Sequence, residues 1–299
     1  MTDTVHVIGA GGRSGVAVRR ALLAQGRAVV PVVRNGARYE ETLTPGERSN
    51  PLLQLPRIAD LTGATDVLAT ALADATVIVC TAHARNIPAL LEAAPKEARL
   101  VCLGSTRKFT RWPDAHGNGV LKGERALMQS GRSGIILHPT MIYGAQGENN
   151  VQRLAALLRR LPVIPLPGGG KSLVQPIHQD DVTASIIAAI DRNWDGPHSL
   201  AIAGAVPVTY RDFVLLVARA AGLRRRPVIT VPARLLIAAS ALLRRLPGFP
   251  EIGPDEIRRL MEDKNVDIIP MIETLGVRPI SLGVGLKRLF SGDEHHADL

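Results

Sequence analysis

The chain has 299 residues, of which 46% are hydrophobic and 21% charged, a composition typical of a globular protein and not of a disordered, collagen-like or coiled-coil chain. The length predicts two domains, or one large domain with an appended lobe. The formal net charge of +9 favours anionic partners, yet only 3% of residues are aromatic, too few for the stacking surfaces of proteins that bind single-stranded nucleic acid. Nucleic acid is therefore a disfavoured partner.

Short β-branched runs alternate with longer helical stretches along the first half of the chain. Strands are expected at about 5–8, 28–33, 76–80, 99–103 and 134–138, and helices at about 13–25, 65–74, 86–94 and 120–131. This alternation is typical of right-handed βαβ units in a parallel sheet. Segment 35–57 holds three prolines and is predicted to be a long connection, with at most a short strand before Asp60.

The cysteines and the apolar segments indicate the cellular compartment of the protein. Cys80 and Cys102 lie inside apolar runs, which favours two buried thiols over a disulfide or a metal pair. The first residues, MTDTVHVIG, lead straight into a strand-like run and do not resemble a secretory signal. The apolar stretch 235–243 is about half the roughly 20 residues that a membrane-spanning helix needs. These features predict a cytoplasmic protein.

The first predicted strand runs directly into a glycine-rich turn, GAGGRSG, and then into a helical stretch. This order exposes backbone N–H groups at a helix N-terminus, where a pyrophosphate can bind. The spacing is G-x-x-G-x-x-G, because Ser14 stands where the third glycine of the usual dinucleotide fingerprint belongs. The residues predicted to contact a dinucleotide here are Gly9, Gly11, Gly12, Arg13, Ser14 and Gly15.

The end of the second predicted strand bears on which dinucleotide is bound. A cofactor without a 2′-phosphate is usually held there by an Asp or Glu, but Arg34 and Asn35 stand at this point. A guanidinium can pair with a 2′-phosphate, and Arg13 in the glycine turn can approach the same group. We therefore expect NADP(H) in preference to NAD(H).

The order of these pieces resembles the extended and atypical short-chain dehydrogenase/reductase family, which includes nucleotide-sugar epimerases and dehydratases. Beside the glycine turn, the resemblance rests on Asp60-Leu61, Gly104-Ser105-Thr106, Lys122 with Glu124, HPTMIYG at 138–144 and QPIHQDD at 175–181. It implies an α/β fold: a Rossmann-type doubly wound parallel sheet with a smaller C-terminal substrate lobe. It also implies that Asp60 and Leu61 lie near the adenine, and that Pro139, Thr140 and Met141 line the nicotinamide.

The domain boundaries follow from the same comparison. The dinucleotide-binding domain is expected over 1–145, with a contribution from about 174–205. The substrate lobe is expected over 146–173 and 206–290, followed by a flexible tail at 291–299. A homodimer through the helices that flank the sheet is usual in the family.

The family's chemistry uses a tyrosine and a lysine spaced Y-x-x-x-K, with a Ser or Thr after the fifth strand. The resemblance assigns Lys122 to the nicotinamide ribose and Ser105 or Thr106 to the reacting substrate oxygen. Asn118 stands at the tyrosine position, and an amide cannot ionise, so the usual proton shuttle is missing. His116 is an alternative titratable group, although it is expected in the loop before the helix.

Further contacts are predicted around the lobe. Tyr143 and Lys171 are the candidate substrate contacts, with some of Arg224–Arg226. In QPIHQDD, the acids directly precede a helical run and are predicted to cap it rather than to bind a metal with His178. No metal site is expected.

Two main functions stay open at this point. One is an NAD(P)(H)-dependent oxidoreductase, epimerase or dehydratase acting on a nucleotide-sugar-like or other polar carbonyl or hydroxyl substrate, which Lys122 and the lobe favour. The other is a catalytically atypical NADP(H)-binding sensor, regulator or assembly factor, similar to NmrA-type regulators or to the accessory subunit of respiratory complex I, which Asn118 favours. Peripheral membrane contact through the apolar segment 231–247 is a third interpretation.

Overall fold

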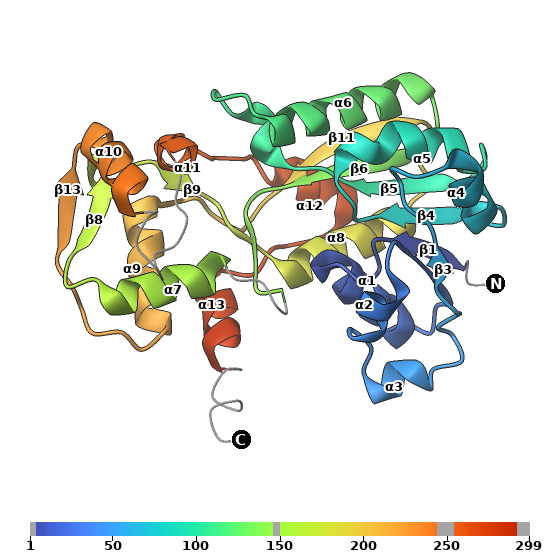
Figure 1. Ribbon diagram of the computed structural model, residues 1–299, viewed down its shortest axis with the longest axis horizontal. Helices are drawn as coiled ribbons and strands as arrows, with labels where there is room; N and C mark the ends of the chain where they lie inside the picture. Colours follow the sequence, from blue (N-terminus) through green and yellow to red (C-terminus); the bar gives the residue numbers. More distant parts are fainter. Residues whose placement is uncertain (1–3, 146–149, 244–253, 292–299) are drawn as a thin grey trace.

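A seven-stranded parallel sheet forms the centre of the computed structural model, which describes residues 4–145, 150–243 and 254–291 (Figure 1). The strand order is β11-β6-β5-β4-β1-β2-β3. The strands are β1 (Val5–Ile8), β2 (Val29–Val33), β3 (Arg57–Ile58), β4 (Val77–Cys80), β5 (Arg99–Leu103), β6 (Gly134–Pro139) and β11 (Pro197–Ile202). The five predicted strands are confirmed to within one residue at each end. The order reverses direction beside β1, so the carboxyl ends of β1 and β4 flank the crevice where such sheets bind ligands.

Helices cover both faces of the sheet, because alternate side chains of each strand point to opposite faces. Val77 and Val79 of β4 belong to the hydrophobic core beneath α1 (Arg13–Ala24), α8 (Gln179–Ile190) and α12 (Ile269–Leu275). The intervening Ile78 and Cys80 belong to the core beneath α4 (Thr65–Leu72), α5 (Ile87–Ala93) and α6 (Ala115–Ser130). The predicted doubly wound α/β sheet is therefore confirmed.

The connection 35–57 is more ordered than predicted. It contains two short helices, α2 (Gly36–Glu40) and α3 (Pro45–Arg48). Thr44 and Glu47 form a reciprocal capping box at the start of α3. The fully buried Arg19 of α1 donates to Glu47 at 2.9 and 2.7 Å, which holds this connection against the sheet domain.

Helix α6 begins five residues before its predicted start. The side chain of Asp114 accepts a hydrogen bond from the Gly117 N–H at 2.7 Å, which caps the helix, and Gly131 ends it with φ +67°. The glycines in the first turns hide this start from a propensity argument. His116 and Asn118 therefore lie on the helix, and the prediction that His116 lies in a preceding loop is wrong.

A smaller lobe with its own hydrophobic core lies beside the sheet domain (Figure 1). Its elements are α7 (Asn150–Arg160), β8 (Ile164–Pro167), β9 (Leu173–Val174), β12 (Val208–Thr209), α9 (Tyr210–Ala220), β13 (Val228–Val231), α10 (Ala233–Leu243), α11 (Pro254–Arg259) and α13 (Leu282–Ser291). Val151, Phe213 and Leu286 lie in this core. The segment assigned to the lobe is interrupted, because Met271 and Leu275 of α12 are buried against the sheet domain.

The apolar segment 231–247 begins with the last residue of β13 and continues through α10, where Leu235 is 62% exposed. Its last four residues, and the predicted tail from residue 292 onward, lie outside the described residues. Within the described ranges, no helix combines the length and the apolar character needed to cross a bilayer.

Candidate cofactor and substrate site

The glycine turn between β1 and α1 is built by backbone contact. Gly9 has φ +80°, a conformation that favours glycine. A Cβ on Gly15 would lie 2.1 Å from the carbonyl oxygen of Gly9, so only glycine fits there. The first residues of α1 are Arg13, Ser14 and Gly15, so its free N–H groups have no acidic neighbour in the first turn. This cradle fits a pyrophosphate.

A cleft of about 960 Å³ extends from this turn to the lobe. It is lined by the carboxyl-end loops of β5 and β6 on the sheet side, and by α7, α9 and α11 on the lobe side. The structure brings the following predicted residues together in its lining: Arg13, Ser14, Ser105, Thr106, Pro139, Thr140 and Met141. Ser14 Oγ also donates to Gln179 Oε1 at 3.0 Å, which links α1 to the buried start of α8.

Three other predicted dinucleotide contacts, Arg34, Asp60 and Leu61, follow β2 and β3 and lie outside the described lining of the cleft. Arg34 is exposed at the end of β2, and Leu61 is buried after β3. Hydrogen bonds from the backbone and the hydroxyl of Thr62, helped by the Arg34 charge, lower the pKa of Asp60. An anionic Asp60 therefore lies close to the guanidinium predicted to meet a 2′-phosphate.

The hydroxyls after β5 line the cleft. Ser105 Oγ accepts from the Arg107 N–H at 3.1 Å and caps the 3₁₀ helix η2 (Thr106–Phe109), which leaves its own proton available to a ligand. Thr106 Oγ1 donates to the Pro139 carbonyl at 3.2 Å. The Ser105 N–H donates to Nδ1 of the buried His138, whose pKa burial and the Lys108 charge lower to about 4. His138 is thus a neutral support beneath Ser105.

The inner face of α6 carries residues other than those assigned by the resemblance. Asn118 and Lys122 are exposed, and the cleft lining within the described residues includes neither of them. His116 lines the cleft instead, and Val120, four residues later, is buried with 1% exposure. Because i and i+4 share a helix face, the pair at the expected spacing is His116 and Val120. Asn118 and Lys122 thus lie on a different face of α6 from His116 and Val120, and their assignment to the site stays a prediction.

The two predicted substrate contacts, Tyr143 and Lys171, differ in burial. Tyr143 is only 1% exposed, its ring packs edge-on to His178 at 5.2 Å between centroids, and burial raises its pKa. A Cβ on Gly285 of α13 would meet the Tyr143 hydroxyl, so the tyrosine joins the lobe to the sheet domain. Lys171 is exposed at the end of the 3₁₀ helix η3 (Gly168–Gly170). Neither belongs to the described lining of the cleft.

The motif QPIHQDD forms the start of α8, with a different cap from the one predicted. His178 Nδ1 accepts from the Asp180 N–H at 3.2 Å, so the histidine is the cap and both acids lie in the first turn. Asp181 accepts from the Ile280 N–H at 3.2 Å. Burial raises the pKa of Asp181 to about 6.

This raised pKa predicts a pH dependence of stability. Between pH of about 4 and 6 the folded chain holds a proton on Asp181 that the unfolded chain has lost, so the free energy of unfolding falls as the pH rises through this window. Asp181→Asn keeps a carbonyl oxygen that can accept from the Ile280 N–H. The free energy of unfolding of this variant should fall by about 1–2 kcal/mol less over the same pH window. Urea unfolding of both proteins at pH 4, 5, 6 and 7 measures it; parallel stability curves would contradict the prediction.

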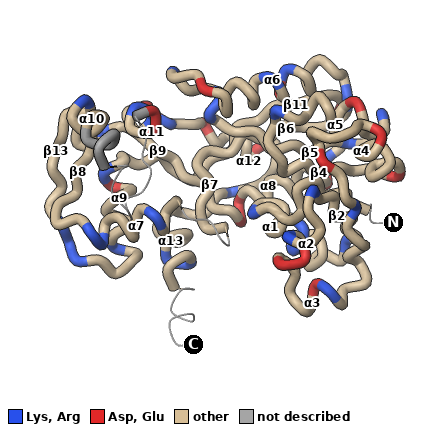
Figure 2. Tube along the Cα trace, in the orientation of Figure 1, with Lys and Arg blue, Asp and Glu red and all other residues tan. Residues whose placement is uncertain are grey.

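Several cationic residues that line the cleft were not predicted from any sequence motif. They are Arg107 and Arg111 from the sheet domain, and Arg153, Arg259 and Lys264 from the lobe, against the acids Glu256, Glu262 and Asp263. Burial, with Arg259 and Arg107 nearby, lowers the pKa of Lys264. Figure 2 shows the same excess across the lobe, where residues 150–173 hold four basic and no acidic residues. The cleft therefore suits an anionic ligand.

Glu262 closes one side of the cleft. It accepts from Thr110 Oγ1 at 3.0 and 2.8 Å and from the Arg111 N–H at 2.7 Å, which ties the loop before α6 to the segment after α11. Arg259 approaches Asp114 at 3.4 Å across the same boundary. The two halves of the cleft are thus joined by charged contacts.

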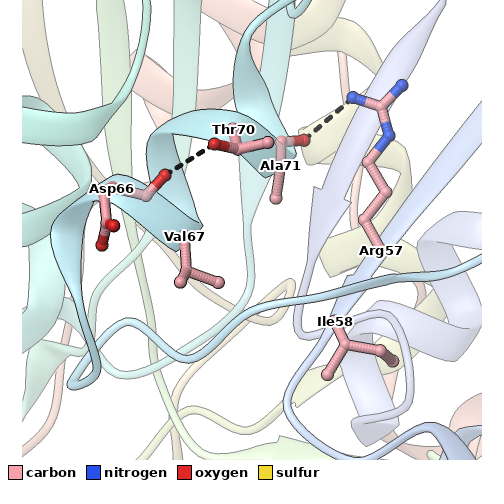
Figure 3. A pocket seen from close by; sticks show the side chains of 6 residues that line it. All are labelled: Arg57, Ile58, Asp66, Val67, Thr70 and Ala71. Atoms are coloured by element: carbon pink, nitrogen blue, oxygen red, sulfur yellow. Dashed lines mark hydrogen bonds between the residues drawn. The ribbon is translucent and has the colours of Figure 1, made fainter.

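A separate hollow of about 470 Å³ lies at the sheet edge, between β3 and α4 (Figure 3). Arg57 donates to the Ala71 carbonyl at 3.0 Å, and Thr70 donates to the Asp66 carbonyl at 2.8 Å. Ile58 and Val67 supply the apolar side chains. Because these polar groups bond to neighbouring backbone, the hollow lacks the converging chemistry of the large cleft.

Comparisons with known proteins support the fold. No protein-family model matches the chain, and no curated protein matches it by sequence. The structure is similar to UDP-glucose 4-epimerase from Thermotoga maritima with UDP-glucose, with a TM-score of 0.73 and 15% identity over 99% of this chain and 100% of the other. It is similar to UDP-glucuronic acid 4-epimerase from Bacillus cereus with UDP-glucuronic acid and NAD, with a TM-score of 0.72 and 16% identity over 98% and 99%.

A third similar structure is a short-chain dehydrogenase/reductase superfamily protein from Agrobacterium tumefaciens with bound NAD, with a TM-score of 0.68 and 16% identity over 98% of this chain and 97% of the other. The resemblance inferred from the motifs is confirmed at the level of the fold along nearly the whole chain.

Proposed function

We propose that the chain is an NADP(H)-binding enzyme of the extended short-chain type, an oxidoreductase, epimerase or dehydratase whose second ligand is anionic and nucleotide-sugar-like. One observation carries the proposal. A single cleft joins the open N-terminus of α1 and the Ser105 and Thr106 hydroxyls to the cations of the lobe. Ligands at the carboxyl ends of the strands of such a sheet meet in this place.

The residues fit a dinucleotide along its length. The glycine turn would hold the pyrophosphate, Arg34 and Arg13 the 2′-phosphate, and Asp60 and Leu61 the adenine end. Pro139, Thr140 and Met141 would line the nicotinamide, which supplies or accepts hydride when bound. Thr140 is held by a hydrogen bond from its hydroxyl to the Gln175 carbonyl at 2.5 Å, so this wall of the site is fixed before any ligand arrives.

The second ligand would occupy the lobe side of the cleft. Arg153 of α7, Arg259 of α11 and Lys264 face it from separate segments. Guanidinium and ammonium groups recognise phosphate and carboxylate oxygens. The solved structures with UDP-glucose and UDP-glucuronic acid support trying this ligand class first.

NADPH is expected to bind at least tenfold more tightly than NADH, because Arg34 forms a charge-assisted pair with the 2′-phosphate. Arg34→Ala should weaken NADPH binding about tenfold and change NADH binding less than twofold. Fluorescence titration of the reduced nicotinamide measures both affinities, with Arg38→Ala on α2 as the matched control. Equal affinity of the unmodified protein for the two cofactors, or a preference for NADH, would refute the NADP(H) preference.

A second candidate function is an NADP(H)-binding sensor, regulator or assembly factor. Helix α6 favours it, because Asn118 stands where the resemblance expects a tyrosine, and the cleft-lining His116 is followed four residues later by the buried Val120 and not by a lysine. The discriminating measurement is consumption of bound NADPH during incubation with UDP-sugars and simple carbonyl compounds. Turnover of any of these establishes an enzyme, whereas tight NADPH binding with no turnover across the panel favours the sensor.

A further inference from the structure

Two histidines meet beside the cleft, on elements that follow different strands. His83 lies three residues after β4 and caps the 3₁₀ helix η1 (Ala84–Asn86), and His116 lies in the first turn of α6. Their ring nitrogens, His83 Nε2 and His116 Nδ1, are 3.1 Å apart, with the rings edge-on at 77°. Both side chains are half-buried, and His116 lines the cleft.

Bare backbone on α6 allows this approach. A Cβ on Gly119 would lie 3.0 Å from His83 Cε1, and a Cβ on Gly123 would lie 1.9 Å from the Ala84 carbonyl oxygen. The two glycines therefore let η1 rest directly on α6. The position of His83 is set by backbone packing rather than by a mobile side chain on the surface.

The hydrogen bonds determine which ring nitrogens carry protons. The Arg85 N–H donates to His83 Nδ1 at 3.0 Å, so this nitrogen must be unprotonated. In neutral His83 the proton then lies on Nε2, which donates to His116 Nδ1. His116 in turn carries its proton on Nε2, the nitrogen left for a ligand.

The charges around the pair keep it neutral. Arg85 follows His83 on η1, Arg107 reaches His116 from η2 and Arg259 from α11, while Asp114 at the start of α6 is the one acid acting on His116 among the described residues. Burial, with His116 and the Arg85 charge nearby, lowers the pKa of His83 to about 4. Burial, with the Arg107, Arg85 and Arg259 charges, lowers the pKa of His116. A second proton on His83 would lie on Nδ1, where it would oppose the Arg85 N–H.

We propose that His83 locks His116 as a neutral imidazole whose Nε2–H is a fixed hydrogen-bond donor into the cleft, for an acceptor oxygen of the second ligand such as a carbonyl. The lock makes His116 a donor and not a base, since its cleft-facing nitrogen has no free lone pair. This inference rests on the proposed function for the identity of the ligand only.

The chemical consequence concerns the role of His116. A neutral donor in the same cleft as Ser105 can bind and polarise an acceptor oxygen of a ligand without transferring a proton to it. Removal of a hydroxyl proton would need a free lone pair on Nε2, which the lock withholds. Any proton that leaves or joins the reacting oxygen must therefore be carried by another group, such as Ser105 or water.

Nuclear magnetic resonance of ¹⁵N-histidine-labelled protein tests the lock without any ligand. Two-bond nitrogen–proton correlations from pH 8 to pH 5.5 should show both rings as neutral Nε2–H tautomers throughout. His83→Gln, whose amide can still donate to His116, should preserve the pattern, whereas His83→Phe should release His116 into a tautomer mixture with a higher pKa. His198→Gln, at the exposed His198–Asp195 pair, is the matched control. An Nδ1–H tautomer of His116, or its protonation near pH 6.5 in the unmodified protein, overturns the lock.

The donor role is tested with NADPH present and a panel of UDP-sugars and carbonyl compounds. Binding or turnover of one class should fall about tenfold in His116→Phe and recover within threefold in His116→Gln, with a downfield shift of the His116 Nε2–H signal. Equal behaviour of both variants and the unmodified protein, or no shift with any compound, overturns it. Failure of NADPH to bind counts against the proposed cofactor alone, because the tautomers are read independently.

Discussion

Arg19→Ala is expected to lower the free energy of unfolding by about 3–5 kcal/mol, because it leaves the buried Glu47 carboxylate without its fully buried cationic partner. The Arg19 side chain is 0% exposed and also donates to the Ala10 carbonyl at 3.1 Å and to the Thr42 carbonyl at 3.2 Å. Since Ala10 belongs to the glycine turn, NADPH affinity should fall as well. Urea unfolding and the nicotinamide titration measure the two effects.

Arg20 is the matched control for this change. It also contacts Glu47, at 3.3 Å, but its side chain is 36% exposed, so Arg20→Ala should cost about 1 kcal/mol or less. The double variant Arg19→Ala/Glu47→Ala should recover part of the loss, because no charge is then left buried. Similar costs for Arg19→Ala and Arg20→Ala would show that the buried pair does not stabilise the connection 35–57.

The sheet was predictable because its strands are buried on both faces and therefore read as short apolar runs. Strand β4, VIVC, and strand β5, RLVCL, are examples. Cys80 and Cys102 are opposite each other in β4 and β5, and both are free and buried, which confirms the prediction of two buried thiols. The burial of Arg19, by contrast, could not be predicted from its neighbours in the sequence. Val18 and Leu22 indicate the inner face of α1, but Glu47, which pairs with Arg19, lies 28 residues further along the chain.

The candidate site was predictable where backbone geometry determines it and not where side chains from distant segments meet. The backbone determines where the glycine turn and the strand ends lie, so Ser105, Thr106 and Thr140 were predicted from the sequence and do line the cleft. The start of α6 was missed because the glycines in its first turns hide the cap at Asp114, so His116 was expected in a loop and not on the helix that lines the cleft. The lobe cations, such as Lys264, follow no spacing rule, since the fold of the lobe alone brings them to the cleft.

Gly15→Ala is expected to abolish NADPH binding and to lower the free energy of unfolding by about 2–4 kcal/mol. The added Cβ would lie 2.1 Å from the Gly9 carbonyl oxygen and 2.9 Å from Ala10 Cα, both of them backbone atoms that cannot turn aside. The turn and the start of α1 must then separate, which removes the cradle for the pyrophosphate.

Gly11→Ala is the matched control for stability. Its Cβ would meet Tyr39 at an ordinary 3.5 Å, so the substitution should change the free energy of unfolding by less than about 1 kcal/mol. Urea unfolding, circular dichroism and the NADPH titration of both variants decide it. A folded Gly15→Ala protein that binds NADPH as well as the unmodified chain would mean that the pyrophosphate is held elsewhere.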